Sequence, residues 1–501
     1  MKNINVLIDS FIKIQDNGVV DFVNLPKLLE LLMTKSTVDI VFQVDHHYMY
    51  GREFLAYLIV HCIEVANVDF NKVKEWSEDD WKKSLLALTD SNLSFWNMIE
   101  PDLTKSAFLQ PALEDSTTKC KDPKTYHYAA EIDIPITGKE HFVKPEKGED
   151  YLLWFWTLIS AQMGSFYGGR GNYGTFRMNS GLGSRVFLVR DVGFHLSENI
   201  QRDVSVILDD FNDKDYKPFN LKGKRLLWIY PYLDNTPQYI VNDIHPLVIE
   251  VCRRIRLKLD SNNIIADFYT SENTCIDRSF SDAFKSGIVR CPYMPLQKDS
   301  KTGLPVKTYS VGVGAFDLAK IEQIFNTNGT SHQLLGRSQK PKTNLVSVMM
   351  LELEQGKSGA YKHYTFIDRS DDSDSLGDKL KIAEERKREH VESLRKDINQ
   401  IIRLERPGLH KNDRSALQSV AQTELTTYLD DFILNTPGLL EDIANLFPVA
   451  SYMLDSKDAG YPIYQKIKSF KIDLLAKVFS KITEKKGLTL SEICAILSFI
   501  K

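Results

Sequence analysis

Apolar and polar residues alternate along the first part of the chain in two rhythms. The first ten residues alternate in part, with Val6, Ile8 and Ser10 against Leu7 and Asp9, which predicts an opening strand. The Asp-Asn-Gly sequence at 16–18 predicts a tight turn, so that residues 5–23 form a β-hairpin. Apolar residues then follow the spacing of amphipathic helices, each with one face toward a core. The predicted helices cover residues 24–33, 50–66 and 78–98.

The pattern changes twice further along the chain. From about residue 120 to 370, short β-like runs alternate with turn clusters and long loops. Residues 368–378 hold five aspartates with serines and a glycine, which is typical of a solvated linker. Four helical segments follow. The first two end at the Pro-Gly pairs 407–408 and 437–438, the third spans about 439–455, and the fourth begins near 463.

These patterns predict an α+β protein. We expect a large mixed α/β N-terminal domain with long loops over residues 1–367, an acidic linker over 368–378 and a C-terminal four-helix bundle over 379–501.

Composition narrows the classes of function. The 501 residues are 43% hydrophobic and 26% charged, and 63 Lys and Arg against 67 Asp and Glu give a net charge of −4. A general polyanion binder is therefore excluded, and any nucleic-acid surface must be local. Six cysteines without a C-x-x-C pair argue against a disulfide scaffold or a zinc knuckle. We expect a cytoplasmic protein with no membrane segment.

The densest feature of the sequence is a glycine-rich, basic stretch. Seven of the 26 glycines lie between residues 164 and 183, and residues 151–190 contain no acidic side chain. Glycine permits close approach of a ligand to the backbone, and basic surroundings suit a phosphate-bearing ligand. The alternative is a surface loop in which the glycines have only a structural role. Interleaved side chains favour binding, and they are Arg170, Asn172, Tyr173, Arg177 and Asn179.

Residues 169–174 of this stretch match the dinucleotide-binding pattern G-x-G-x-x-G. That motif should follow a buried strand and open a helix, but the residues after Gly174 contain further glycines and no helical pattern. A nucleotide-binding enzyme that uses the loop from Gly169 to Gly174 nevertheless stays open as an alternative.

Other candidate chemistry is sparse. The Asp45-His46-His47 sequence is expected to be an exposed turn, because the further aspartates of a metal-dependent phosphoesterase are missing. His195, His245 and His332 are isolated in the sequence and have no zinc-site spacing. We therefore expect no catalytic residue, no metal and no cofactor.

Two further segments are basic and flexible in sequence. Residues 298–307 carry three lysines around a Thr-Gly-Leu-Pro turn, which predicts a hairpin tip. Residues 355–362 follow an apolar strand at 345–353 and match only half of a P-loop. Both segments could be no more than solvated turns.

Taken in order, these segments resemble the CasA family, which is the large subunit of Cascade, the type I-E CRISPR surveillance complex. The similarity covers most of the first 370 residues in patches, and the terminal helical bundle is also a feature of the family. Its most specific part is the glycine-rich segment 169–185. The matching segments are 5–14, 24–29, 107–110, 134–144, 169–185 and 355–361.

The resemblance implies a DNA reader without enzymatic activity. In the family, the guide RNA supplies sequence specificity, while the large subunit reads a short adjacent motif from the minor groove and starts strand separation. The reading parts are a glycine loop, a lysine finger and a glutamine wedge. By position they fall on Gly168, Gly169, Arg170, Gly171, Asn172, Tyr173 and Gly174 for the loop, on Lys307 for the finger, and on Gln355, Gly356 and Lys357 for the wedge.

The resemblance also implies contacts beyond the motif. Lys139, His141 and Lys144 match a loop that folds onto DNA or neighbouring subunits, and Arg177 and Asn179 are assigned to the same role. The implied partners are double-stranded target DNA, the guide-RNA-containing Cascade subunits (backbone, small and crRNA 5′-end subunits) and a helicase-nuclease. A helical scaffold subunit that does not read DNA remains the second alternative.

Overall fold

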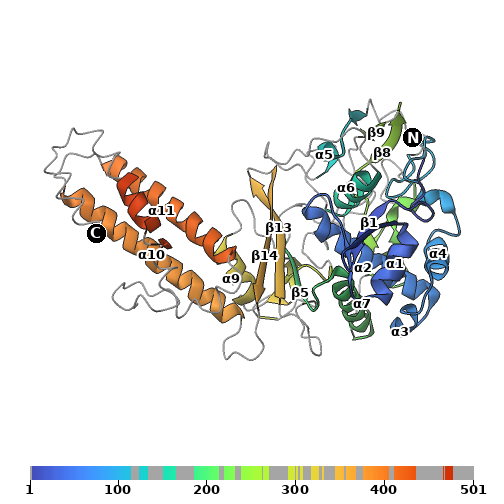
Figure 1. Cartoon of the computed structure of the whole chain (residues 1–501), viewed down its shortest axis with the longest axis horizontal. Helices are drawn as coiled ribbons and strands as arrows, with labels where there is room; N and C mark the ends of the chain where they lie inside the picture. Colours follow the sequence, from blue (N-terminus) through green and yellow to red (C-terminus); the bar gives the residue numbers. More distant parts are fainter. Residues whose placement is uncertain are drawn as a thin grey trace. The chain divides into compact units, whose positions relative to one another are not determined.

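The structure is a computed structural model, and its described residues form two compact units. The first unit combines Met1–Ala315 with Asn328–His363, and the second combines Phe316–Thr327 with Tyr364–Lys501. The mixture of helices and small sheets confirms the α+β class (Figure 1). The described residues are 3–113, 123–133, 151–164, 186–213, 219–231, 239–261, 263–269, 291–298, 301–302, 305–308, 317–326, 330–331, 334, 345–354, 357–367, 376–404, 411–435, 466–467 and 469–477.

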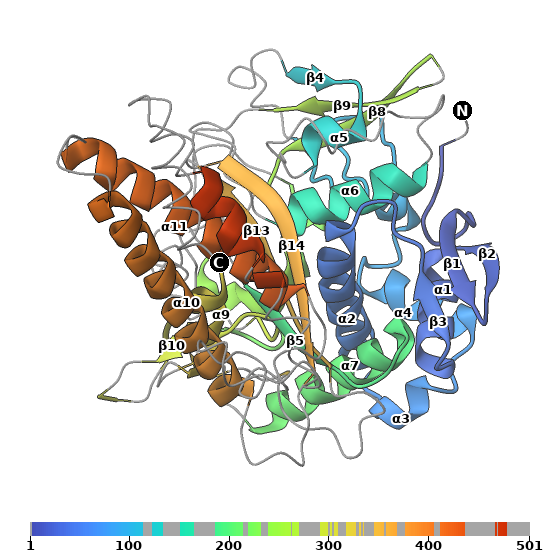
Figure 2. The same ribbon diagram turned by 60° about the vertical axis from the view of Figure 1, so that its left-hand side comes forward.

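The first unit is built around helix α2 (His46–Ala66), and the side chains along most of this helix are buried. Helices α4, α6 and α7 all pack against α2 (Figure 2), and α1 packs on both α4 and α7. Because α2 is surrounded, even its charged residues Arg52 and Glu53 lie in the core. The neighbouring helices are α1 (Leu25–Thr34), α3 (Phe70–Val73), α4 (Glu78–Ala87), α5 (Ala129–Ile132), α6 (Tyr151–Met163) and α7 (Leu196–Asp213).

The predicted N-terminal hairpin is confirmed in part. Strands β1 (Ile12–Asp16) and β2 (Val19–Val23) pair antiparallel, and β3 (Val38–Ile40) pairs with the other edge of β1. Asn17 and Gly18 both have positive φ, which a two-residue hairpin turn requires. The predicted strand over residues 1–10 is wrong, because residues 5–9 fold back as turns in which the Asn5 side chain binds Leu93 and Asn97.

The early helices begin where local chemistry predicts. Asn24 caps α1 by accepting a hydrogen bond from the Lys27 amide at 2.8 Å, and Pro26 lies in the first turn. Helix α4 begins at a capping box of Ser77 and Asp80. The helix predicted over 78–98 ends early, at Ala87, and a short 3₁₀-helix covers Leu93–Trp96.

Four further small sheets lie in the part predicted to be strands and loops. Their strand orders are β14-β13-β5, β11-β10-β12, β4-β9-β8 and a parallel β6-β7 pair. The strands are β4 (Lys124–Tyr126), β5 (Phe187–Asp191), β6 (Lys224–Leu226), β7 (Ile244–Ile249), β8 (Ile255–Asp260), β9 (Asn263–Phe268), β10 (Leu296–Lys298), β11 (Pro305–Thr308), β12 (Thr330–Ser331), β13 (Leu345–Glu354) and β14 (Lys357–Ile367). Short 3₁₀-helices cover Leu227–Ile229 and Val241–Asp243.

Helices α6 and α7 interrupt this region and were not predicted. Helix α6 is apolar on all sides and buried on nearly all of them, so it shows no amphipathic stripe. Among the described residues, no helix combines the length and the apolar character that a membrane crossing needs.

Apart from the end of β14, the described part of the second unit is helical. Helix α10 (Leu376–Leu404) packs against α11 (Lys411–Leu434) and against α9 (Leu318–Asn326), which comes from earlier in the chain. Residues 469–477 form a further helical piece whose Phe470 ring stacks on Tyr428 at 3.9 Å between centroids. Helix α10 begins at Leu376, within the predicted linker. The third predicted helix lies outside the described residues, and the bounds of the three predicted domains remain predictions.

Candidate nucleic-acid interface

Most residues of the predicted DNA-reading site lie outside the described residues. This holds for the loop from Gly168 to Gly174, for Arg177 and Asn179, for the Gln355–Gly356 pair, and for Lys139, His141 and Lys144. Lys307 lies in strand β11 and Lys357 opens strand β14, and for both only the backbone is described. The described residues therefore show the strands that precede or follow these segments in the chain. We call these strands their supports.

Strand β5 is the support of the glycine-rich segment. Residues 165–185 connect the end of α6 at Gly164 to Val186, which directly precedes β5. All five residues of β5 are buried, and they pair antiparallel with β13 from Phe187 opposite Met349 to Asp191 opposite Leu345. The segment therefore enters the sheet at the Phe187 end of β5.

The predicted wedge extends from the same end of this sheet. Strands β13 and β14 are neighbours joined by residues 355–356, so the predicted strand before position 355 is confirmed, whereas residues 357–362 of the expected turn belong to β14. Because β13 runs antiparallel to β5, it continues past Phe187 toward the side from which the glycine-rich segment arrives. Six residues separate Met349 from position 355, a reach of about 20 Å along an extended strand.

The hairpin that carries the predicted lysine finger is also linked to the Phe187 end of β5. The Leu188 amide donates to the Tyr293 carbonyl at 2.8 Å, and the Tyr293 ring stacks on Phe187 at 4.4 Å. Strand β10 follows Tyr293 closely and pairs with β11, with Lys307 opposite Gln297, which confirms the predicted basic hairpin. Gln297 is four residues from Tyr293, or at most about 14 Å of chain. The segments that carry the three predicted reading elements are thus each linked to the Phe187–Leu188 end of β5, through β5 itself, through β13 and through Tyr293.

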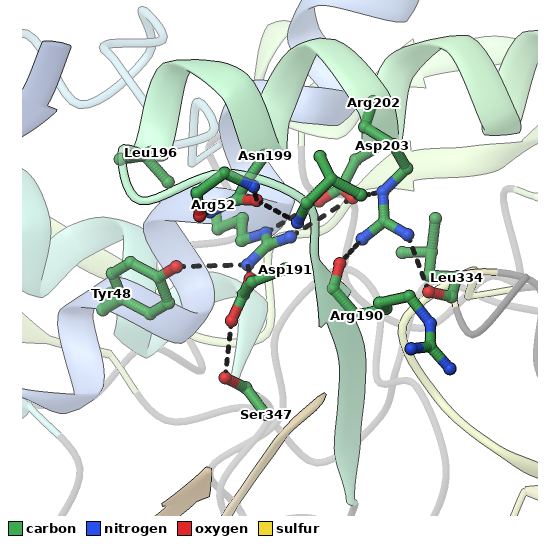
Figure 3. Close-up of polar contacts among 12 residues, drawn as sticks. Tyr48, Arg52, Arg190, Asp191, Leu196, Asn199, Arg202, Asp203, Leu334 and Ser347 are labelled. Atoms are coloured by element: carbon green, nitrogen blue, oxygen red, sulfur yellow. Dashed lines mark hydrogen bonds and ion pairs between the residues drawn. The ribbon is translucent and has the colours of Figure 1, made fainter. Parts of the chain in front are cut away.

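A buried polar cluster anchors the other end of β5 (Figure 3). The Arg52 guanidinium of α2 binds the Asp191 carboxylate at 2.6 Å and the Asp203 carboxylate of α7 at 2.7 and 3.2 Å. Ser347 of β13 donates to the second Asp191 oxygen at 2.7 Å. One arginine therefore joins α2, α7, β5 and, through Asp191, β13.

Neighbouring side chains complete the cluster. Arg202 of α7 donates to the carbonyl of Arg190 and, at 2.8 Å, to that of Leu334. Tyr48 accepts a hydrogen bond from Arg52 at 3.1 Å, and burial raises the pKa of Tyr48 to about 12. Burial alone would lower the pKa of Arg52, but Asp203 and its other neighbours raise it well above its usual value. The cluster is a fixed ion network that positions the sheet, and its only sign in the sequence is one arginine among the many apolar residues of α2.

A second buried cluster holds the base of the predicted contact loop. Asp133, the last described residue before position 134, binds the Nε2 atoms of His46 and His47 at 2.9 and 2.8 Å and also accepts from Ser160 at 2.5 Å. Burial would raise the pKa of Asp133, but the two histidines lower it well below its usual value. The expectation of an exposed turn at residues 45–47 is wrong, since both histidines are buried at the start of α2.

This cluster could geometrically hold a metal ion, as could a second group of His61, Glu64 and His245. The nitrogen–oxygen distances of 2.8 and 2.9 Å around Asp133 are those of hydrogen bonds. In the second group, Nδ1 of His245 accepts from the Leu247 amide at 3.0 Å, so Nε2 carries the hydrogen and donates to Glu64 at 3.1 Å. In this tautomer the one ring lone pair of neutral His245 accepts from the Leu247 amide, so it is not available to a metal.

Two of the three histidines that are isolated in the sequence have partners in the fold. His245 belongs to the buried group just described, and burial lowers its pKa to about 4. His195 binds Asp39 through Nδ1 at 2.7 Å. His332 lies outside the described residues. Sequence separation hid these pairs, because the partners are 181 and 156 residues apart.

Comparison with known proteins finds similarity in structure only. No family model matches the chain, and no curated protein matches its sequence. CasA (Cse1) of Thermus thermophilus matches with a TM-score of 0.55 and 11% identity, covering 100% of this chain and 98% of that one. Cse1 of Acidimicrobium ferrooxidans matches with a TM-score of 0.59 and 12% identity, covering 100% and 96%.

A third solved structure is a chain of a CRISPR RNA-guided surveillance complex. It matches with a TM-score of 0.56 and 11% identity, over 100% of this chain and 99% of that one. The whole chain therefore has the fold of CasA (Cse1), as the sequence resemblance predicted.

Proposed function

We propose that this chain is the large subunit of a type I-E-like CRISPR RNA-guided surveillance complex. In this proposal it recognises the motif beside the target in double-stranded DNA from the minor groove, starts duplex unwinding and R-loop formation, and presents the surface that recruits the helicase-nuclease. Its partners are target DNA, the guide-RNA-containing subunits and that effector, in the cytoplasm. In this proposal the chain itself does not cleave DNA.

One observation carries the proposal beyond the shared fold. The segments predicted to form the glycine loop, the lysine finger and the glutamine wedge lie far apart in the sequence, yet each is linked to the Phe187–Leu188 end of β5. A minor-groove reader needs its parts on one side of the duplex, where backbone, a cation and a wedge reach neighbouring base pairs.

Each part has a distinct physical task in this proposal. The glycines within residues 168–174 let the backbone approach the floor of the narrow minor groove. The ammonium of Lys307 has only hydrogen-bond donors and meets the acceptors that every base pair presents in the minor groove. Gln355 inserts beneath a base pair, at an unstacking cost of a few kcal/mol that contacts to the opened strands offset.

The test is duplex binding by the guide-RNA complex reconstituted with this chain. Gln355→Ala and Lys307→Ala are each expected to weaken binding about tenfold or more, because each removes contacts that are made only to the opened or adjacent duplex. Lys301→Ala tests the neighbouring lysine of the same hairpin. Lys83→Ala, on an α4 side chain that is 79% exposed, is the matched control and should change affinity less than twofold.

The outcomes separate the proposal from its two alternatives. Normal assembly with unchanged DNA binding by the Gln355 and Lys307 variants would favour the scaffold subunit. Thermal stabilisation of the chain by nucleotides, with none by duplex DNA, would favour an enzyme that uses the loop from Gly169 to Gly174.

A further inference from the structure

The solvent face of the N-terminal sheet carries apolar side chains where polar ones are expected. In β1 and β3 the other face is buried, with Ile12, Ile14 and Ile40 in the core. The opposite face presents Val20 at 49% and Phe22 at 51% exposure, both on strand β2. Strand β2 is the outer strand of this sheet (Figure 2). An antiparallel sheet with one face in water normally alternates apolar and polar residues, so two adjacent exposed hydrophobic positions break the pattern.

A third exposed apolar side chain is held near this face by a rigid turn. Phe194, between β5 and α7, is 75% exposed. Every backbone amide from residue 192 to 196 donates to a side-chain oxygen: two to Asn199, two to Glu198 and one to Asp39. A Cβ on Gly193 would lie 2.0 Å from Glu198, so only glycine fits there. The fold therefore fixes the backbone that carries an aromatic ring exposed to water.

Asp39 connects the two features. Its carboxylate accepts from the Leu196 amide and binds His195, both at 2.7 Å, and in the sheet it stands opposite Gln15, which stands opposite Val20. Directly paired residues of antiparallel strands share a face, and two strand spacings amount to about 10 Å. Val20, Phe22 and the Phe194 turn therefore border one surface around Asp39, which we call the Phe194 face.

The charge of this surface favours a protein over nucleic acid. The charged side chains on it or beside it include Lys13, Asp39 and Glu198, with Gln15 and His195 also present, so cations are not clustered on this surface. Phosphate backbones require clustered cations, whereas protein interfaces combine aromatic side chains with few charges at their centre. Asp39 retains 42% side-chain exposure and can meet a partner's basic group.

We infer that the Phe194 face binds a protein subunit of the surveillance complex, through an apolar surface with a lysine or arginine opposite Asp39. This inference rests on the proposed function for the identity of the complex. The face is separate from the DNA-reading elements, because Phe194 follows the Asp191 end of β5 whereas those elements are linked to its Phe187 end.

The test measures binding of this chain to the guide-RNA complex purified without it. The double variant Phe22→Ser/Phe194→Ser should raise the apparent Kd at least tenfold and leave the thermal midpoint of the free chain unchanged, because both rings are exposed. Ile240→Ser, at 49% exposure, is the matched control and should bind like the natural chain. Hydrogen exchange on the natural chain provides a second readout, in which amides 13–22 and 193–196 should slow on assembly.

Each result has a distinct meaning. If the natural chain joins the complex and the double variant joins it equally well, with no slowing of exchange on this face, the inference is wrong. If assembly is intact and only duplex affinity falls, the face contacts DNA and the protein assignment is overturned. If the natural chain does not join the complex at all, the proposed function fails and the partner named here fails with it.

Discussion

At the scale of single residues, the most consequential side chain is Arg52. It is fully buried in helix α2 and binds two carboxylates from two other elements. A buried ion pair contributes little net stability compared with an apolar replacement of the whole set. Removing one partner is different, because Asp191 and Asp203 would then remain charged in the core.

We therefore expect Arg52→Ala to lower the free energy of unfolding by about 3–5 kcal/mol. Arg395→Ala, which removes an exposed ion pair with Glu392 at 3.0 Å, should cost less than about 1 kcal/mol. Urea unfolding of both variants measures the difference. Equal losses in the two variants would contradict the anchoring role of Arg52.

His245 gives the molecule a predictable response to acid. Its pKa is about 4 in the folded chain, against an ordinary value of 6.5, so the unfolded chain binds the proton more readily between these values. The contribution of neutral His245 to stability is therefore complete above about pH 6.5 and is lost as the pH falls toward 4, by about 3 kcal/mol in total.

His245→Gln should reduce this acid sensitivity, because an amide can donate and accept hydrogen bonds without titrating. Urea unfolding at about pH 7 and about pH 5 should show a smaller loss of stability in the variant than in the natural chain. An unchanged pH slope would show that His245 is not a source of the response.

At the scale of elements, strands β5 and β13 act as one unit because backbone pairing and a buried side-chain hydrogen bond both join them. Backbone pairing covers all of β5, and the Ser347–Asp191 hydrogen bond ties β13 to the Arg52 cluster. The Tyr293–Phe187 stack then joins the segment that leads into the basic hairpin.

Ser347→Ala should therefore cost about 1–3 kcal/mol, because it leaves one oxygen of the buried Asp191 carboxylate without this donor. Hydrogen exchange should show amides of both β5 and β13 exchanging faster and to a similar degree. Faster exchange in β13 alone would show that the two strands open independently.

The elements also show what the sequence can predict. The hairpin turn at Asn17–Gly18 and the cap at Asn24 depend on neighbouring residues, so the local pattern was sufficient. Helix α6 was missed because a helix buried on all sides has no polar face. The pairing of β5 with β13 joins residues 154 to 162 positions apart, and no local pattern contains that information.

At the scale of the whole molecule, the α+β class was predictable and the order of the sheets was not. The candidate site was predictable only as segments with suitable chemistry, through resemblance to the CasA family. The shared link of those segments to one end of β5 became visible only in three dimensions. A chain with a net charge of −4 can read DNA only through such a local arrangement.

The most direct test of the central claim is duplex binding by the guide-RNA complex, with and without this chain, across a library of randomised flanking sequences. The account predicts that binding depends on the chain and selects a short flank, and that Gln355→Ala and Lys307→Ala weaken it. A chain that joins the complex and leaves all flanks equally bound would contradict the claim.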